Sequence, residues 1–154
     1  MPFRITGLPA EPFAELFALS DEALSERRAM RVVADSAHGY PCRVSLTDAE
    51  PGQSLLLLNY EHQPANSPFH SNYAIYIREG EEQYDRVNEV PDQLRRRLLS
   101  VRGFDDRGML RDADVAQGTA LEPVIERLFA DEKIAYLHIH IAKPGCYAAR
   151  VDRL

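Results

Sequence analysis

The sequence lacks long hydrophobic runs and an excess of positive charge, and each shortage excludes a class of protein. The run Leu55–Leu58 has four leucines, and no stretch approaches the ~20 apolar residues of a membrane-spanning helix. Lys and Arg number 18 against 24 Asp and Glu, which gives a net charge of −6 with His neutral. Nucleic-acid binding depends on clustered cations, so we expect neither a nucleic-acid partner nor a membrane span.

Cysteine is scarce, and the signatures of several common enzyme classes are missing. The only cysteines are Cys42 and Cys146, and Met1–Arg4 lacks the apolar core of a signal peptide. We therefore expect a cytoplasmic protein in which both side chains are thiols. The sequence also has no P-loop, no G-x-G-x-x-G and no G-x-S-x-G, which removes the usual nucleotide and serine-hydrolase motifs. We expect no cofactor.

The length of 154 residues fits one domain, residues 1–154. A chain of this size buries roughly 68–70% of its extended-chain surface, so folding does not require a metal or a disulfide. The hydrophobic periodicity changes between helical and strand spacing along the chain. We predict an α+β fold with one mostly antiparallel mixed sheet and helices packed on it.

Helical spacing appears near the beginning, the middle and the end of the chain. Pro12 precedes an apolar stripe, and Ser20 has the features of an N-cap. Pro91 can open a further short helix. The strongest prediction begins at Thr119–Glu122, which matches a capping box. Its apolar stripe is formed by Leu121, Val124, Ile125, Leu128 and Phe129.

Strand signals alternate with turn signals over the rest of the chain. Lys143–Cys146 is typical of a type II turn between the last two strands. Asp105–Gly108 is typical of a hairpin turn. The predicted strands are 31–35, 42–46, 55–58, 73–78, 101–104, 109–115, 135–142 and 147–152.

The segment Tyr136–Ile141 combines a strand with two histidines. Alternation places His138 and His140 on one face of the strand, while Leu137, Ile139 and Ile141 take the other and pack on the predicted helix. Imidazoles two residues apart, about 6.6–6.8 Å along a strand, can converge on one ion. A zinc site needs a third protein ligand, and no other donor has a spacing that identifies it. We therefore assign no metal ligand, and expect hydrogen-bonded histidines in a polar pocket near Tyr136 and Tyr147.

The turn after this strand predicts a register for the histidines. If Lys143 pairs with Cys146, His140 faces Ala149 and His138 faces Val151. Tyr147 then lies on the histidine side of the sheet, and Cys146 lies on the opposite side. A bulge or a one-residue slip would change these pairs.

Two further segments carry side chains that could take part in catalysis or binding. Cys42 is followed by Arg43, whose guanidinium could favour a reactive thiolate with a histidine as its base. The alternative is a buried thiol that acts as a small hydrophobic side chain. His62 and His70 flank a polar loop between two strands, where a binding role competes with a simple surface loop.

Four motifs, taken in order, resemble a bacterial domain-of-unknown-function family, number 1203. They are Tyr40-Pro41-Cys42-Arg43, Tyr60-x-His62-x-Pro64, Arg78-Glu79 and His138-x-His140-x-Ala142-x-Pro144-Gly145-Cys146-Tyr147. The resemblance spans nearly the whole chain and implies a small, single-domain, bacterial cytoplasmic protein without a transferable activity. An Asn often follows the second His of the last motif in that family, whereas this chain has Ile141. The resemblance marks Cys42, Arg43, Tyr60, His62, His138, His140 and Cys146 for testing.

We expect a small-molecule or anion-binding protein, with an enzymatic role left open and an Arg- and His-lined site on one sheet face. The candidate ligand-binding residues are Arg43, Tyr60, Arg78 and Cys146, and the candidate catalytic residues are Cys42, His62, His138 and His140. One alternative is a non-catalytic interaction protein that forms a homodimer. A second alternative is a metal-dependent enzyme that uses His138 and His140. A pocket that collects Arg43, His62 and His138 would favour the binding site.

Overall fold

The computed structural model describes residues 1–154 and confirms the α+β class. The strands are β1 (Phe3–Thr6), β2 (Ala29–Val33), β3 (Ser54–Gln63), β4 (Ser71–Ile77), β5 (Asp85–Val87), β6 (Leu98–Phe104), β7 (Leu110–Gln117), β8 (Tyr136–Ile141) and β9 (Tyr147–Arg153). The helices are η1 (Glu11–Ala18), α1 (Asp21–Glu26), α2 (Asp92–Arg95), η2 (Gly118–Ala120) and α3 (Leu121–Phe129), of which η1 and η2 are 3₁₀ helices. No helix is both long and apolar enough to cross a membrane.

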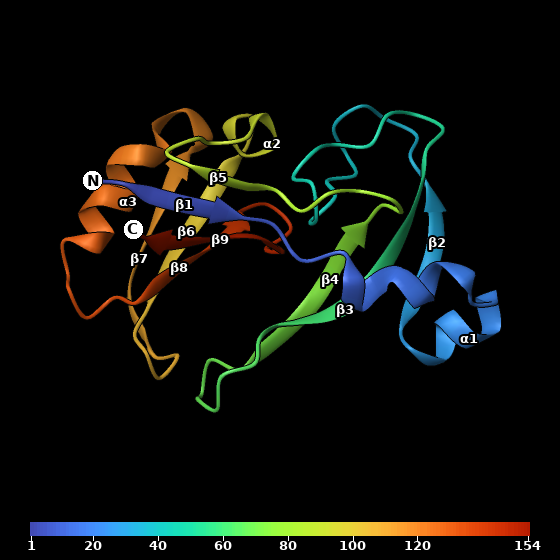
Figure 1. The fold of residues 1–154 in the computed structure, drawn as a ribbon, viewed down its shortest axis with the longest axis horizontal. Coiled ribbons are helices and arrows are strands. Elements are labelled where there is room, and N and C mark those ends of the chain that lie inside the picture. Colours follow the sequence, from blue (N-terminus) through green and yellow to red (C-terminus); the bar gives the residue numbers. More distant parts are fainter.

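The strands form two sheets rather than the one predicted sheet (Figure 1). The larger has six strands in the order β5-β1-β9-β8-β6-β7, and the smaller has the order β2-β3-β4. Every pairing between neighbouring strands is antiparallel, so neither sheet is mixed in its pairings. β6 lies between β7 and β8 and runs antiparallel to both, so β7 and β8 are parallel to each other. The helix α3 connects β7 to β8. This connection is the strand–helix–strand crossover indicated by the sequence.

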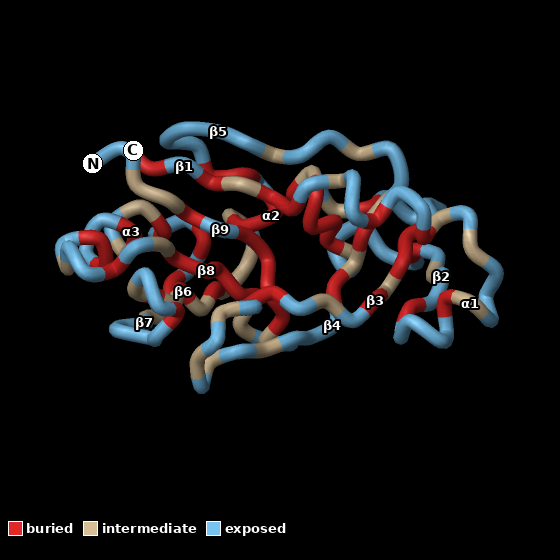
Figure 2. Tube along the Cα trace, turned by 60° about the horizontal axis from the view of Figure 1, so that its bottom comes forward, coloured by how far each residue is buried: buried red, intermediate tan, exposed pale blue.

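Each sheet has its own hydrophobic cluster, and buried residues follow the inner strands of both (Figure 2). Four of the five residues in the predicted α3 stripe are buried against the six-stranded sheet, while Val124 is half-buried. Leu137, Ile139 and Ile141 of β8 belong to this cluster, as predicted. A second cluster joins η1 and α1 to β3 and β4. The apolar periodicity therefore identified the correct faces of both α3 and β8.

Several local predictions are confirmed, and one helix cap is wrong. Ser20 Oγ accepts a hydrogen bond from the amide of Ala23 at 3.1 Å, which caps α1 as expected. Thr119 instead lies within η2, and α3 begins without a side-chain cap. The acidic member of the predicted capping box, Glu122, forms a two-pronged ion pair with Arg95 of α2. The carboxylate thus joins two helices instead of closing one helix end.

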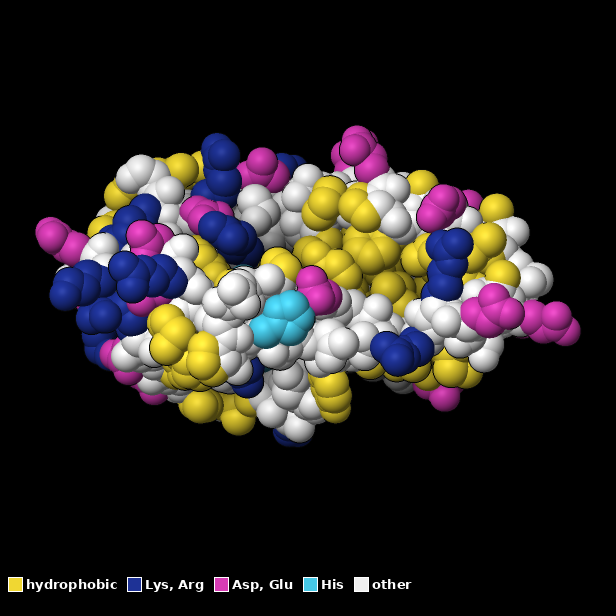
Figure 3. Space-filling view, turned by 90° about the horizontal axis from the view of Figure 1, so that it is seen from below, with side chains coloured by type: hydrophobic (Ala, Val, Ile, Leu, Met, Phe, Trp, Pro, Cys, Tyr) yellow, Lys and Arg dark blue, Asp and Glu magenta, His cyan; other side chains and the backbone are white.

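The strands β1 and β5 were not predicted, because each is short and lies within a segment whose other residues dominate the pattern. β1 pairs with β9 on one side and with β5 on the other. This pairing brings the two chain ends together beside α3 (Figure 1). On the face seen in Figure 3, basic side chains gather over the six-stranded sheet, while hydrophobic side chains fill a hollow towards the smaller sheet.

Candidate functional site

The segment Cys42–Leu46 is a loop, so the predicted strand there is wrong. Its backbone makes only isolated bridges, including one between Cys42 and Tyr76. Its apolar side chains are nevertheless buried: Val44 packs in the cluster of the smaller sheet and Leu46 packs in the cluster of the larger sheet. The apolar alternation therefore reflects a loop anchored in two cores. It holds Arg43 at the junction between the sheets.

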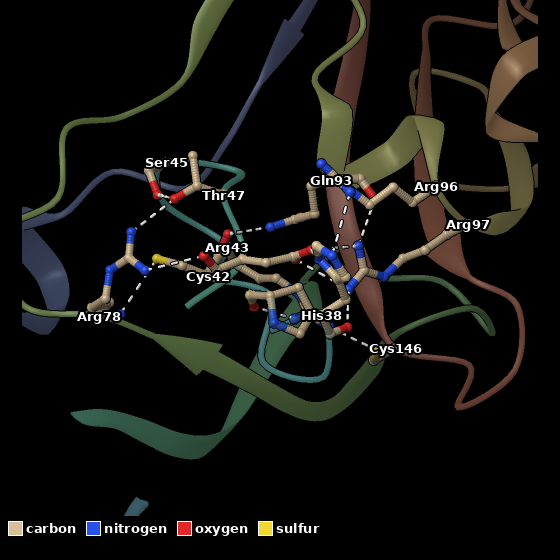
Figure 4. Close-up of polar contacts among 12 residues, drawn as sticks. His38, Cys42, Arg43, Ser45, Thr47, Arg78, Gln93, Arg96, Arg97 and Cys146 are labelled. Atoms are coloured by element: carbon tan, nitrogen blue, oxygen red, sulfur yellow. Dashed lines mark hydrogen bonds and ion pairs between the residues drawn. The ribbon is translucent and has the colours of Figure 1, made fainter. Parts of the chain in front are cut away.

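Arg43 is the most deeply buried charged side chain of the protein, with 1% of its surface exposed. Its Nε donates to the carbonyl of Tyr147 at 2.7 Å and its Nη1 donates to the carbonyl of Pro41 at 2.5 Å. Its Nη2 donates to Cys146 Sγ at 2.8 Å (Figure 4). No carboxylate pairs with it, and burial lowers the pKa of Arg43 while Cys146 opposes that shift. A buried cation surrounded by neutral acceptors is electrostatically costly.

A cavity of about 530 Å³ opens beside Arg43 at the junction of the two sheets. Four cationic side chains and His38 line it, and no acidic side chain does so, although the whole protein carries a charge of −6. The cations are Arg43, Arg96, Arg97 and Lys143. Apolar and aromatic walls come from Pro41, Leu57, Tyr73, Ala74, Tyr76, Leu98, Ile141, Pro144 and Cys146.

The other cavity cations differ in how far protein groups satisfy them. Arg97 forms an ion pair with the buried carboxylate of Asp48 at 3.1 Å. Arg96 approaches His38, with 3.4 Å between Nη1 and Nε2. Lys143 is exposed and has no ion-pair partner. Arg96 and Arg97 stand beside Arg95 in the sequence, and nothing in the spacing of these residues shows that two of them line a cavity.

Only Arg43 and Cys146 of the candidate residues line this cavity, and Arg78 and Cys42 are engaged elsewhere. The guanidinium of Arg78 is occupied by Glu81, by Thr47 Oγ1 at 2.8 Å and by Gln53 Oε1 at 3.0 Å. Cys42 is fully buried in the core of the smaller sheet, where its Sγ accepts from the amide of Arg78 at 3.4 Å. Figure 4 shows Arg78 and Cys42 near one another and Cys146 apart from them. The sulfur that contacts Arg43 is therefore Cys146, not its sequence neighbour.

Three histidines meet at a second place, outside the cavity. His62 comes from β3, while His138 and His140 come from β8, and one ring nitrogen of each lies within 4.8 Å of the other two. The ring of Tyr147 stacks on His62 with centroids 5.6 Å apart and presents its edge to His138 and His140. Tyr60, another candidate, packs against Phe13.

The surroundings keep these histidines neutral at pH 7. Burial lowers the pKa of His138 and of His140 to about 3, and it also lowers the pKa of His62. Cations add to the effect, since Arg102 on β6 acts on all three rings. No carboxylate contacts any of the three rings. Each imidazole therefore has a lone pair available on one nitrogen.

The histidine register differs from the one predicted by a plain turn. A bulge in β9 pairs His138 with Arg150 and His140 with Tyr147, whereas Ile139 faces Ala149. Tyr147 still lies on the histidine side, as expected. His140 pairs with Tyr147 on the turn side of the bulge, so the turn already sets a different register, and the extra residue of the bulge then changes the partners beyond it. A change of this kind is the alternative that the sequence left open.

The candidate residues thus gather at two places instead of one pocket. The cavity contains Arg43 and Cys146 but none of the three clustered histidines. The turn between β8 and β9 connects the two groups. The carbonyl of Gly145 bonds to His140 Nδ1 at 2.9 Å, while Cys146 and Tyr147 accept from Arg43.

Comparison with known proteins gives one finding. The sequence model of the family described as "Protein of unknown function (DUF1203)" matches residues 39–153 of this chain. The matched region contains the cavity residues other than His38, the three histidines and the turn between β8 and β9. No curated protein and no solved structure matches the chain.

Both cysteines should react with a thiol reagent when the protein is unfolded without reductant. They are free in the structure and both are buried. We expect two reactive thiols per chain in denaturant and slow reaction of Cys42 in the native protein, because its side chain has no exposed surface. Mass spectrometry of freshly prepared protein provides the check, and an intramolecular disulfide would contradict this prediction.

Proposed function

The chain belongs to the DUF1203 family, and we propose that this protein binds a small organic anion in the cavity beside Arg43. The observation that carries the proposal is a buried guanidinium without a carboxylate partner in the wall of a cavity without acidic side chains. An anion bound in the cavity would neutralise the charge of Arg43 and supply the missing partner of an ion pair.

The donor count of Arg43 supports this proposal. A guanidinium has five N–H groups, and three of those on Arg43 donate to protein acceptors. Two N–H groups therefore remain for a ligand. Charge-assisted hydrogen bonds to a carboxylate or phosphate are short and roughly twice as strong as neutral ones. Lys143 adds a flexible cation at the same cavity.

The walls of the cavity favour a ligand with an apolar part. A volume of about 530 Å³ lies within the range of small-molecule sites, about 300–1,000 Å³. Tyr73, Tyr76 and Leu98 offer aromatic and aliphatic surface opposite the cations. An aromatic or aliphatic carboxylate fits this combination better than a bare inorganic ion.

We restrict the proposal to binding, without a catalytic step. A thiol nucleophile needs a positioned base, and the histidine that lines the cavity, His38, contacts Asp48 and Arg96 rather than Cys146. The buried histidines lie outside the cavity. Cys146 therefore acts as a hydrogen-bond acceptor for Arg43 in this proposal.

Calorimetry and thermal denaturation with benzoate and with its neutral analogue benzamide test the proposal. We expect benzoate to bind and raise the melting temperature, and benzamide to do neither at the same concentration. Arg43→Met should weaken benzoate binding about 10–100-fold, because charge-assisted hydrogen bonds contribute about 1.5–3 kcal/mol. Inorganic phosphate, tested in parallel, should bind more weakly than benzoate.

Two further variants control for damage to the fold. Lys143→Met changes an exposed side chain at the cavity and should weaken benzoate binding without altering stability. Arg27→Met removes an exposed arginine that pairs with Glu15 far from the cavity, and it should bind benzoate as the wild type does. Equal binding of benzoate and benzamide, or unchanged benzoate binding in Arg43→Met and Lys143→Met, would overturn the proposal.

A further inference from the structure

A second group of side chains, the three buried histidines, has no role in anion binding. His62, His138 and His140 are 9%, 4% and 1% exposed, so water does not solvate their rings freely. They come from two different sheets and converge, with one nitrogen of each within 4.8 Å of the others. We infer that these three histidines form a binding site for one divalent transition-metal ion of the zinc type.

Unsatisfied nitrogen atoms support this inference. Nδ1 of His62 and Nδ1 of His138 are buried and have no hydrogen-bond partner. Burying a polar atom without a partner costs about 1–3 kcal/mol, and folded proteins avoid it. A metal ion would coordinate lone pairs on these rings and so account for the burial of nitrogen atoms that have no hydrogen-bond partner.

The third histidine is held in the orientation typical of a metal ligand. The carbonyl of Gly145 can only accept, so its 2.9 Å contact with His140 Nδ1 places the proton on Nδ1. Nε2 of His140 then carries the lone pair. Metal-binding histidines almost always donate their other nitrogen in this way, and the hydrogen bond fixes both the tautomer and the ring orientation.

The distances and the ligand set fit zinc with one open position. Zinc–nitrogen bonds of about 2.0–2.1 Å place tetrahedral ligands about 3.3 Å apart, so each nitrogen needs to move by less than about 1 Å. Three protein ligands and a fourth position for water are the arrangement of catalytic zinc sites. Neutral imidazole also suits zinc, whereas magnesium and calcium prefer oxygen ligands.

The charges around the cluster indicate what occupies the fourth position. The three ligands are neutral, and Arg102 and Arg150 lie near the rings. Arg150 is largely compensated, since it bonds to Asp152 and lies over the ring of Tyr136 at 4.3 Å. Because the three ligands are neutral, the charge of a bound divalent ion is not compensated by them, and Arg102 adds a further positive charge nearby. This environment favours an anionic fourth ligand, hydroxide or a ligand oxyanion, over neutral water.

Zinc titration of metal-free protein, purified without an affinity tag, tests the inference. Competition with a chromophoric chelator should give one zinc per chain, and His140→Ala should weaken the affinity more than about 100-fold, beyond the effect of removing an outer hydrogen-bond partner. His62→Gln serves as a second ligand variant if His140→Ala does not fold. His70→Ala is the matched control, because His70 is exposed and contacts Glu61 on the surface. It should bind zinc as the wild type does.

Cobalt(II) in place of zinc identifies the ligand type. We expect the visible bands of a four-coordinate site without a thiolate-to-cobalt charge-transfer band, since Cys42 and Cys146 are not ligands. Arg43→Met should bind zinc normally, which separates this inference from the proposed anion site. Zinc affinity that is absent in the wild type, insensitive to both ligand variants, or accompanied by a thiolate band would overturn the inference.

Discussion

Acidification of the metal-free protein from pH 7 to pH 5 should lower its free energy of unfolding by about 4 kcal/mol, chiefly through His138 and His140. Burial lowers the pKa of each to about 3 in the folded protein, whereas an unfolded histidine has a pKa of about 6.5. Below pH 6.5 the unfolded chain therefore binds protons that the folded protein does not. The contribution of the neutral histidines to the free energy of unfolding is fully present above pH 6.5 and is lost progressively as the pH drops towards 3.

The size of this effect follows from 1.36 kcal/mol per pKa unit, which gives about 2 kcal/mol for each histidine at pH 5. The charged groups that act on the rings are cations, namely Arg102, Arg150 and, for His140, Arg43, and a proton on one ring also disfavours a proton on the next. Carboxylates with lowered pKa values, such as Asp105 and Asp131, titrate below this window. The range from pH 7 to pH 5 therefore isolates the histidines.

Urea denaturation at pH 7, 6 and 5 in the presence of a chelator measures this loss. His138→Gln removes one of the two groups and should roughly halve the loss of stability between pH 7 and pH 5. His70→Gln, on the exposed loop, should leave the pH dependence as it is in the wild type. A flat profile in the wild type, or an equal slope in His138→Gln, would show that the buried rings are protonated in the folded protein.

Leu128→Ala should lower the free energy of unfolding by about 2–5 kcal/mol. Leu128 is 1% exposed and lies in the cluster between α3 and the six-stranded sheet, together with Leu137 and Ile139 of β8. The substitution leaves a cavity that the surrounding strands cannot close without breaking their own hydrogen bonds. Equilibrium denaturation in urea at pH 7.5 gives the value directly.

The matched control for Leu128→Ala lies on the opposite side of the same helix. Glu126 is exposed and has no ion-pair partner, so Glu126→Ala should change stability by less than about 0.5 kcal/mol. The two variants differ in burial but share a helix and a nearly equal helix propensity. A similar small change in both would mean that α3 contributes little to the core.

Periodicity predicted which side chains of α3 and β8 face the core of the six-stranded sheet. The stripe of α3 and the alternation of β8 both faced the predicted core, because one residue spacing decides each face. The Gly145 turn was also predicted, since its φ of +82° is a conformation that glycine adopts readily. These features depend on residues within a few positions of one another.

Features that depend on distant residues could not be predicted in this way. The pattern of Cys42–Leu46 is that of a strand, but its apolar side chains enter two separate cores, and no neighbouring strand pairs along it. The partition into two sheets likewise follows from tertiary packing. No spacing shows that Arg43 reaches Cys146, 103 positions along the chain.

The meeting of the three histidines was predicted only in part, for the same reason. His138 and His140 were identified by their alternation, but the third donor, His62, comes from a strand of the other sheet. The sequence named His62 as a candidate residue beside a loop and within a family motif, but nothing in its spacing placed it near β8. The signal that could have paired it with β8 is the shared family pattern, which marks all three histidines without stating that they meet.

The pairing of β1 with β9 has a consequence for how the protein is made. Arg43 and His62 are synthesised early, whereas their partners in Gly145–Tyr147 and β8 follow at least 76 residues after His62. At about 5–20 residues per second, the ribosome takes about 4–15 s to cover that distance. During this interval the β3–β4 hairpin can form, but the buried cation and the isolated imidazole remain without their surroundings. Both sites are therefore completed only after β9 has been synthesised and closes the six-stranded sheet against β1.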